Sequence, residues 1–275
     1  MHCIAVANQK GGVGKTTTCV NLAAALAGMQ NRVLLFDLDP QGNATVGCGL
    51  DPRSLLVSAY EVLVGTHTIE QVRFELAELG LDLVPSNSDL TAAEVKLLQQ
   101  DEREYALKNA LRAVAARYDW IIVDCPPSLN ILTLNALAAA DSVLIPMQCE
   151  YYALEGLTAL IDTINQVRAS INPDLEIEGL LRTMFDVRNN LSSAVSDQLL
   201  QHFGERVYRT IVPRNVRIAE APSYGLPVLR YDPESKGAQA YLALAGELLR
   251  RRDRKHSAGA GQNVSQDAFS TAKVD

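Results

Sequence analysis

The sequence lacks the features that carry a chain into or across a membrane. Its 275 residues contain no run of 18 apolar residues free of charge, so we expect no membrane-spanning helix. From Met1 the chain runs directly into the strand-like segment CIAVAN, without the charged region, long apolar stretch and cleavage site of a signal peptide. We therefore expect a cytoplasmic protein.

Cysteine and histidine are scarce and widely spaced. The number of cysteines is odd and no two form a CxxC pair, which argues against a disulfide framework or a structural zinc site. We expect the cysteines to be small buried apolar side chains. The scattered histidines likewise indicate no metal cluster. The residues concerned are Cys3, Cys19, Cys48, Cys125, Cys149, His2, His67, His202 and His256.

Positive charge is also in short supply. The chain has 25 Lys and Arg against 32 Asp and Glu, a net charge of −7. This balance excludes a protein coated in positive charge. A nucleic-acid partner would need a local basic patch, or a patch completed by dimerisation.

Apolar runs that predict strands alternate with segments of helical periodicity. Most of the runs are continuous rather than alternating, which is typical of strands buried on both faces of a parallel sheet. The strand-like runs are Cys3–Asn8, Val33–Asp37, Leu81–Pro85, Trp120–Asp124, Ser142–Met147, Glu176–Met184 and Val207–Pro213. Apolar stripes on helices are Leu107, Leu111, Val114 and Tyr118, and Leu154, Leu157, Ile161, Ile164, Val167 and Ile171.

This alternation predicts an α/β fold with a doubly wound, mostly parallel sheet flanked by helices. We expect one domain over residues 1–252. Residues 253–275 contain few large apolar side chains and many Gly, Ser, Ala and Gln, so we expect a flexible polar tail. The tail has no amphipathic stripe that would hold it on a membrane.

A phosphate-binding loop follows the first predicted strand. The segment QKGGVGKTTT opens a predicted helix, and its glycines leave backbone N–H groups free to face phosphate oxygens. Lys15 would contact the β- and γ-phosphates, and the hydroxyl of Thr16 would bind Mg²⁺. The residues expected to cradle the nucleotide are Gly11, Gly12, Val13, Gly14, Lys15, Thr16 and Thr17.

The loop departs from the common pattern G-x-x-x-x-G-K-[ST] at its start. Gln9 stands where the first glycine is expected, and Lys10 adds a second lysine. This form resembles the deviant Walker A motif of the ParA/MinD family of ATPases. The resemblance implies that Lys10 reaches the nucleotide of a second subunit. A dinucleotide-binding turn remains an alternative, with Asp37 as the ribose acid, but it gives Lys15 no role.

Three aspartates stand at predicted strand ends. Asp37 and Asp39 lie in LLFDLDPQGN, and Asp124 ends WIIVD, where it resembles a Walker B acid. In a parallel sheet these ends gather beside the ligand. Asp124 would hold Mg²⁺ through water, Asp39 would orient or deprotonate the attacking water, and Asp37 would serve the same metal shell. The alternative for each is a strand-end acid that caps the next helix.

Longer segments resemble one branch of that family, the ParA/Soj partition ATPases. They include DLDPQGNAT, IIVDCPPSLNILTLNAL, QCEYYALEGL and VYRTIVPRNVRIAEAPSYGLPV, and cover about residues 1–250. The resemblance implies slow Mg-dependent ATP hydrolysis, an ATP-dependent sandwich dimer, non-specific DNA binding on the nucleoid and a ParB/Spo0J-like DNA-bound activator. It places Arg188 and Arg217 on DNA, and Pro213 and Asn215 near the adenine. Whether the cargo is a chromosome or a plasmid stays open.

Other functions remain as alternatives. A MinD-like ATPase cycling on membranes would need an amphipathic C-terminal helix, and an electron-transfer ATPase would need two cysteines per subunit for a bridging cluster. A nucleotide-locked scaffold is possible if Asp39 does not support turnover. For Arg188 and Arg217 the alternative is solvated surface charge. Weaker candidates for DNA contact are Lys236 and Arg250–Arg252, which could equally be charges that stabilise helix ends.

Overall fold

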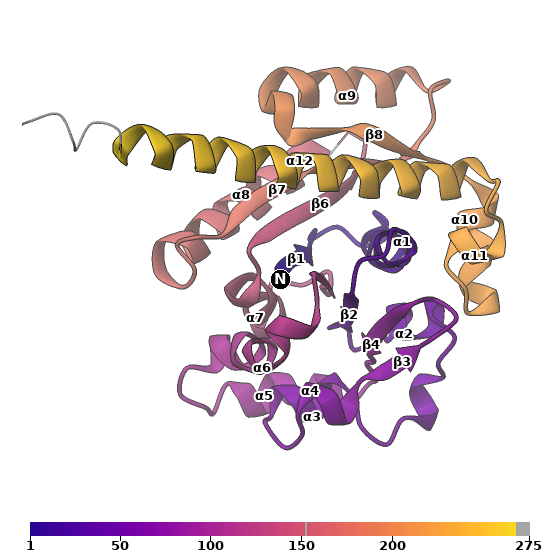
Figure 1. Cartoon of the computed structure of the whole chain (residues 1–275). Coiled ribbons are helices and arrows are strands. Elements are labelled where there is room, and N and C mark those ends of the chain that lie inside the picture. Colours follow the sequence, from indigo (N-terminus) through magenta and orange to yellow (C-terminus); the bar gives the residue numbers. More distant parts are fainter. Residues whose placement is uncertain (152, 268–275) are drawn as a thin grey trace, which may run out of the picture.

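An eight-stranded sheet forms the centre of the computed structural model, which describes residues 1–151 and 153–267 (Figure 1). The strands lie in the order β3-β4-β2-β5-β1-β6-β7-β8, and all pairs are parallel except β3 with β4. The predicted α/β fold with a mostly parallel sheet is therefore confirmed. The strands are β1 (His2–Val6), β2 (Val33–Asp37), β3 (Phe74–Leu76), β4 (Leu81–Val84), β5 (Trp120–Asp124), β6 (Ser142–Gln148), β7 (Glu176–Phe185) and β8 (Val207–Pro213).

Helices cover both faces of the sheet. One face carries α1 (Lys15–Gly28), α2 (Asn43–Gly47), α10 (Val216–Glu220), α11 (Val228–Tyr231) and α12 (Lys236–Asp267). The other carries α3 (Ala59–Leu63), α4 (Ile69–Val72), α5 (Leu90–Leu97), α6 (Ala106–Val114), α7 (Ile131–Ala139), α8 (Ala153–Ser170) and α9 (Asn190–Phe203). Short 3-10 helices are η1 (Pro52–Ser54), η2 (Arg103–Tyr105), η3 (Ala115–Arg117), η4 (Gly204–Arg206) and η5 (Ala221–Tyr224).

The central strands are buried on both faces, as their continuous apolar runs predict. In β1, Cys3 and Ala5 pack into one core while Ile4 and Val6 pack into the other. The predicted stripe of α6 is buried as well, although its last member, Tyr118, follows the helix and η3. All five cysteines are free and buried, which confirms their expected role as small core residues.

The sheet contains a strand that the apolar pattern misses. Strand β3 is antiparallel to β4 at the edge of the sheet, and Phe74 and Glu75 are exposed. Such a short edge strand has no apolar run to reveal it.

The last helix, α12, crosses the predicted boundary after Arg252. Its bounds are Lys236–Asp267, so residues 253–267 continue the helix (Figure 1). Residues 268–275 of the predicted tail lie outside the described part of the chain, and flexibility of the tail stays a prediction. Among the described residues, no helix has both the length and the apolar character needed to span a membrane.

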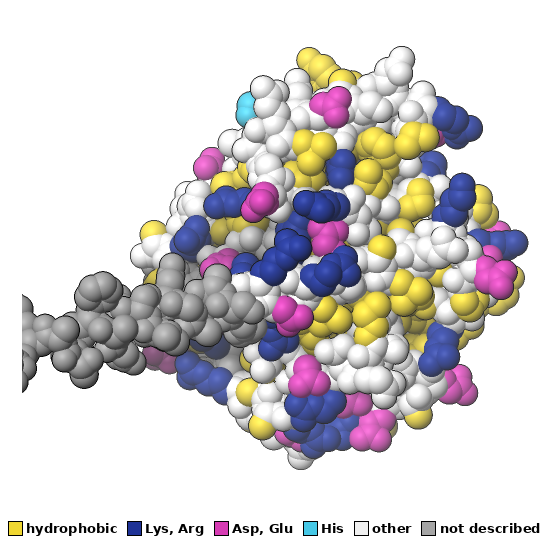
Figure 2. Space-filling view, turned by 45° about the horizontal axis from the view of Figure 1, so that its top comes forward, with side chains coloured by type: hydrophobic (Ala, Val, Ile, Leu, Met, Phe, Trp, Pro, Cys, Tyr) yellow, Lys and Arg dark blue, Asp and Glu magenta, His cyan; other side chains and the backbone are white. Residues whose placement is uncertain are grey.

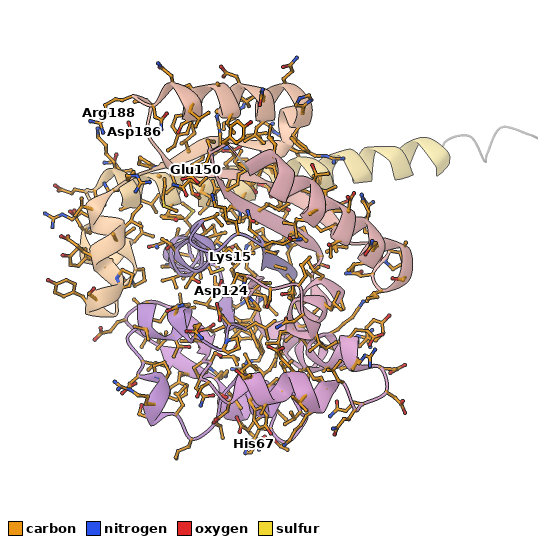
Figure 3. All side chains as sticks on the ribbon, turned by 180° about the vertical axis from the view of Figure 1, so that it is seen from behind. Lys15, His67, Asp124, Glu150, Asp186 and Arg188 are labelled. Carbon is orange, nitrogen blue, oxygen red and sulfur yellow. The ribbon has the colours of Figure 1, made fainter. Side chains whose placement is uncertain are left out.

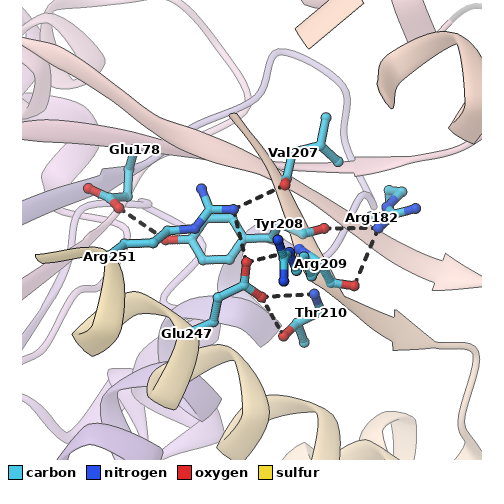
Figure 4. Close-up of polar contacts among 8 residues, drawn as sticks. All are labelled: Glu178, Arg182, Val207, Tyr208, Arg209, Thr210, Glu247 and Arg251. Carbon is cyan, nitrogen blue, oxygen red and sulfur yellow. Dashed lines mark hydrogen bonds and ion pairs between the residues drawn. The ribbon is translucent and has the colours of Figure 1, made fainter. Parts of the chain in front are cut away.

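Two buried charged side chains hold the edge strand β8 in place (Figure 4). The register between β7 and β8 shifts near Arg182, which leaves backbone groups of β8 without ladder partners. Glu247 of α12 accepts hydrogen bonds from the N–H groups of Arg209 and Thr210, both at 2.9 Å. Arg182 donates to the carbonyl oxygen of Tyr208 at 2.9 Å. These backbone N–H and carbonyl groups of β8 therefore have hydrogen-bond partners, Glu247 for the N–H groups and Arg182 for the carbonyl group. The bonds to Glu247 also attach α12 to β8.

We predict that Glu247→Gln lowers the free energy of unfolding by about 1–3 kcal/mol, because it weakens several hydrogen bonds to a buried carboxylate. Burial raises the pKa of Glu247, but its donors, which include Arg251, outweigh burial and lower that pKa below the ordinary value of 4.5. The contribution is therefore present above pH 4.5 and is lost as pH falls below it. Urea unfolding at pH 7 and pH 3.5 measures this difference.

The control is Glu205→Gln, which removes the same charge from an exposed position on η4. Its unfolding should match that of the unchanged chain at both pH values. Equal stability of Glu247→Gln and the unchanged chain at pH 7 would contradict the proposed tie between α12 and β8.

Candidate nucleotide site

The loop between β1 and α1 has the shape of an anion cradle. Gly12 and Gly14 have positive φ values of +73° and +87°, which residues other than glycine rarely adopt. The first backbone hydrogen bond of α1 is donated by Thr18 N to the carbonyl oxygen of Gly14 at 2.9 Å. The N–H groups of residues 15–17 therefore have no acceptor within the helix, and they mark its positive end. A Cβ on Gly11 or Gly12 would meet nothing within 4 Å, so the loop is open on that side.

Neighbouring strands anchor this loop. Asn8 donates through Nδ2 to the carbonyl oxygen of Pro146 in β6 at 2.8 Å. Thr183 of β7 donates through its hydroxyl to the carbonyl oxygen of Val13 at 2.7 Å. The loop is therefore tied to two strands, once through the side chain of Asn8 and once through the carbonyl oxygen of Val13. The sequence did not single out Thr183, whose partner lies 170 residues earlier.

The two loop lysines have different environments. Lys15 is buried and donates to the carbonyl oxygen of Lys10 at 3.2 Å. Burial lowers the pKa of Lys15, against the opposing effect of Asp124. Lys10 is half exposed and pairs with Glu150 at 2.5 Å, outside its own loop. In Figure 3, Lys15 and Asp124 lie near each other at the centre, with Glu150 toward Asp186 and Arg188.

The strand-end carboxylates lie at neighbouring positions of the sheet. Asp124 is in register with Asp37 on one side and with Val6, the last residue of β1, on the other. Both carboxylates are fully buried. The phosphate loop leaves the sheet directly beside them, so strand order brings together groups that are more than 80 residues apart.

The burial and the hydrogen bonding of Asp124 are those expected of a carboxylate that could bind a cation. Burial and then the charge of Asp37 raise its pKa to about 8, although hydrogen bonds from Thr16 and Cys19 act in the opposite direction. Its Oδ2 atom is buried and has no hydrogen-bond partner among the described residues. An unpaired carboxylate oxygen beside the Thr16 hydroxyl fits Mg²⁺, which keeps several waters and takes few protein ligands. The described residues contain no cluster of three or more metal-ligating side chains.

Both carboxylate oxygens of Asp37 already accept hydrogen bonds from other residues of the chain. Its Oδ2 atom accepts hydrogen bonds from the backbone N and the hydroxyl of Thr45 at 2.8 and 2.7 Å, and Oδ1 accepts from Asp39 N at 3.2 Å. Burial raises the pKa of Asp37 to about 6 against these donors. Because Thr45 lies in the first turn of α2, Asp37 has the helix-capping role that the sequence leaves open. Its place in the metal shell stays a prediction.

Asp39 follows on the loop between β2 and α2. Its Oδ1 atom accepts from Gln41 N at 3.0 Å, and its carbonyl oxygen accepts from Gly42 N at 2.9 Å. Its Oδ2 atom has no partner within the described chain, and its side chain is largely buried. One carboxylate oxygen therefore remains available to a water molecule.

The residues predicted to contact adenine and DNA lie at the carboxyl end of the sheet. Pro213 ends β8, and Asn215 caps α10 by accepting from Ile218 N at 3.2 Å. Arg188 precedes α9 and pairs with Asp186 at 2.8 Å (Figure 3). Arg217 of α10 pairs with Glu220 at 2.9 Å and with Asp232 at 3.2 Å. Both arginines are therefore held by carboxylates of the same chain.

Two contacts that the sequence did not reveal join the chain around η5 and α11 to helix α1 and to the segment after α2. Asn21 of α1 accepts from Val228 N at 2.7 Å and donates to the carbonyl oxygen of Thr17 at 2.8 Å. Gly225 lies so close to Gly49, just after α2, that a Cβ on Gly225 would be 2.6 Å from the Cα of Gly49. We call residues 214–231 the arm. It contacts both the phosphate-loop helix α1 and the segment that follows α2.

A separate hollow of about 320 Å³ lies between the α3–α4 connection and α6. Its lining includes Val62, Ile69 and His67 but no Lys or Arg. Figure 3 shows His67 at the end of the molecule opposite Arg188. Because the hollow lacks phosphate-binding groups, the nucleotide site remains with the glycine-rich loop.

Comparisons with known proteins match this geometry. A family profile described as an AAA domain matches residues 1–177. The chromosome partitioning protein ParA of Myxococcus xanthus is 54% identical over 248 residues, which cover 90% of this chain and 88% of that protein. The sporulation initiation inhibitor protein Soj of Bacillus subtilis is 51% identical over 245 residues, covering 89% of this chain and 97% of that protein.

Among solved structures, cobyrinic acid a,c-diamide synthase from Mycobacterium smegmatis, with a bound ATP analog and magnesium, is similar with a TM-score of 0.82. It is 41% identical, and the match covers 92% of this chain and 96% of that one. These similarities extend over about nine tenths of the chain.

We predict that Asp124→Asn flattens the pH dependence of stability in the metal-free protein. Between the ordinary value of 3.8 and about 8, folded Asp124 holds a proton that the unfolded chain releases. Rising pH therefore favours unfolding, by up to about 1.4 kcal/mol per pH unit. Urea unfolding with a chelator between pH 5 and pH 8.5 should show a smaller loss of stability in Asp124→Asn. Mg-ATP should stabilise the unchanged chain but not this variant.

Asp101→Asn, at an exposed aspartate without a partner in the described structure, serves as control and should follow the unchanged chain. A parallel pH dependence in Asp124→Asn and the unchanged chain would show that Asp124 does not carry the buried proton.

Proposed function

Because the chain belongs to the ParA/Soj family of chromosome-partitioning ATPases, we propose that it is an ATP-driven DNA-segregation switch. Its ATP-bound dimer binds DNA without sequence preference, and hydrolysis releases it. The observation that carries this proposal is the arm, because it bears Arg217 and is bonded to the phosphate-loop helix through Asn21. The partition relatives, at 54% and 51% identity, are more similar to this chain than the Mycobacterium synthase at 41%.

ATP and Mg²⁺ are used by this family, and the site has a separate group for each part of the reaction. Bound Mg²⁺ supplies charge neutralisation at the phosphates. Thr16 and Asp124 are the side chains that would hold it, directly and through water. Lys15 binds the β- and γ-phosphates together with the free N–H groups of the loop. Asp39 orients or deprotonates the attacking water through the oxygen that the chain leaves free.

Lys10 completes the site of a second subunit. In the single chain it pairs with Glu150, where both side chains are almost half exposed. Exposed ion pairs contribute about 0–1 kcal/mol, so exchanging Glu150 for a γ-phosphate costs little. ATP therefore favours a sandwich dimer, and removal of the γ-phosphate takes away the group that holds the two subunits together. From the family resemblance, Pro213 and Asn215 are the residues proposed to pack against the adenine of the bound nucleotide.

Local charge supports DNA as the partner. Residues 204–255 contain 11 Lys and Arg but only 6 Asp and Glu, although the whole chain has a net charge of −7. Figure 2 shows several Lys and Arg side chains gathered next to the point where the grey residues begin, with some Asp and Glu side chains among them. Arg188 and Arg217 add forked donors suited to phosphate oxygens. Two copies in a dimer double this surface, and together they hold the chain on the nucleoid.

The remaining partner follows from the family. A ParB/Spo0J-like protein, itself bound to DNA, stimulates hydrolysis and thereby returns the switch to the monomer. Basal turnover is then slow, and the cargo is the DNA that carries the activator.

We predict that duplex DNA of unrelated sequence retains the purified protein with Mg-ATP but not with ADP, and that salt weakens retention. Arg188→Ala and Arg217→Ala should each reduce binding, and the log–log salt slope should be smaller by about 1 for each phosphate that the variant no longer neutralises. Filter binding at two salt concentrations measures both effects.

Arg53→Ala is the matched control. Arg53, like Arg188, is highly exposed (91% and 87%) and pairs with an aspartate two residues earlier, but it lies in η1. Its removal should leave retention unchanged. Absence of retention in every nucleotide state would remove the DNA function and leave the ATPase; binding to anionic vesicles would then be measured as the membrane alternative.

We also predict that Gly225→Ala separates DNA binding from the nucleotide state. The added Cβ would clash with Gly49, so the arm must move away from the segment that follows α2. ATP binding should persist, whereas ATP-dependent retention on DNA should fall about tenfold, within the usual range of coupling between sites. Fluorescent-nucleotide titration and filter binding measure the two effects.

Gly65→Ala provides the control, because Gly65 has a similar φ of +77° but a Cβ there would meet nothing within 4 Å. If Gly65→Ala reduces retention as much as Gly225→Ala, backbone strain rather than the close approach to Gly49 is the cause. Unchanged retention in Gly225→Ala would exclude the arm as the link.

A further inference from the structure

The segment from Asp37 to Thr45 forms a ring, because the carboxylate of Asp37 accepts hydrogen bonds from Thr45 at the other end of the segment. Asp37 Oδ1 accepts from Asp39 N, and Oδ2 accepts from both the backbone N and the hydroxyl of Thr45. The loop that carries Asp39 therefore begins and ends at the same buried side chain. Inside this ring, Gln41 N and Gly42 N donate to Asp39. The shape of the ring decides where the free oxygen of Asp39 points.

The hydroxyl of Thr45 also joins this ring to the segment that follows β4. It accepts a hydrogen bond from the backbone N of Ser86 at 2.8 Å. Because a backbone N–H can only donate, the hydroxyl hydrogen of Thr45 must be directed at Asp37. One buried hydroxyl thus links the end of β2, the first turn of α2 and Ser86, which lies beyond Pro85 after the end of β4.

The packing around Thr45 leaves the ring little freedom. Gly42 has a φ of +63°, and a Cβ there would lie 2.8 Å from the carbonyl oxygen of Ser86. The ring therefore rests directly on the backbone after β4. Loss of the Thr45 hydroxyl would leave the Ser86 N–H buried without an acceptor, and would remove one of the two bonds that Thr45 makes to Asp37. The ring would then shift relative to the sheet.

We propose that Thr45 is a positioning residue for ATP hydrolysis, whose hydroxyl fixes the loop so that Asp39 meets the attacking water. The hydrogen bonds of its hydroxyl go to Asp37 and Ser86, and neither residue belongs to the nucleotide loop. Thr45 thus acts on the catalytic step and not on ATP binding, which belongs to Lys15, Thr16 and the free N–H groups. This inference rests on the proposed role of Asp39.

The test compares Thr45→Val, which keeps the shape but removes the hydroxyl, with Thr45→Ser, which keeps the hydroxyl. Steady-state phosphate release with Mg-ATP gives kcat and KM for each. We expect kcat of Thr45→Val to fall about 10- to 100-fold, because small displacements of catalytic groups have effects of this size. KM should stay within about twofold of the unchanged chain, and Thr45→Ser should restore most of kcat.

The matched control is Thr133→Val, which removes another buried threonine hydroxyl, bonded to the carbonyl oxygen of Ser128 in the connection before α7. It should leave kcat near that of the unchanged chain. If Thr45→Val does not fold, Thr45→Cys replaces it: the thiol is a weak donor and acceptor, so an intermediate kcat is expected. Thermal unfolding of each variant separates slower turnover from loss of folded protein.

Several outcomes would overturn the inference. An unchanged kcat in Thr45→Val, an equal loss in Thr45→Ser, or a raised KM with unchanged kcat would each remove the positioning role. Asp39→Ala in the same series keeps the two ideas apart. If Asp39→Ala hydrolyses ATP normally, the role of Asp39 fails whatever Thr45 does. If Asp39→Ala is inactive and Thr45→Val is normal, only the role of Thr45 fails.

Discussion

Two carboxylates buried side by side are the constraint on which the rest of the site depends. Asp37 and Asp124 are in register on adjacent strands, and neither is exposed to solvent. Each carboxylate in such a place needs donors or a cation, because burial and mutual repulsion both disfavour its charge. Asp37 obtains three donors from the chain, whereas Asp124 keeps one oxygen without a partner among the described residues. The two acids therefore differ: Asp37 holds the loop to α2, and Asp124 is the one proposed to bind the cation.

The position of that pair follows from the order of the strands. The chain places β5 between β1 and β2, so the phosphate loop leaves the sheet next to both aspartates. The apolar runs of β1, β2 and β5 predict strands buried on both faces, which is enough to predict a parallel sheet. The apolar runs do not predict the order of the strands in the sheet, because that order depends on how the connecting helices cross its two faces. The proximity of Asp37, Asp124 and Lys15 was therefore predicted from the motif and not from the strand pattern.

Local signals explain which residues could be identified in advance. The glycines and lysines of the phosphate loop form a contiguous pattern, and so do the strand-end acids. Thr183, Asn21 and Ser86 act through hydrogen bonds to groups 170, 207 and 41 residues away, and nothing in their own segments reveals those partners. Gly225 is similar, because its close approach to Gly49 exists only after folding. Strand β3 was missed because an exposed edge strand needs no apolar run.

The charges on the surface explain why the proposed DNA binding must depend on ATP. Arg188 and Arg217 are both paired with carboxylates of their own chain, so a phosphate has to displace Asp186, or Glu220 and Asp232. Exposed pairs of this kind are weak, and one subunit with two such arginines gains little from the exchange. In the proposed dimer, four arginines would engage one duplex, and the second pair would bind at the high local concentration set by the first. The proposal therefore requires a chain of net charge −7 to hold DNA only as a dimer, with the arm between the proposed nucleotide site and the duplex.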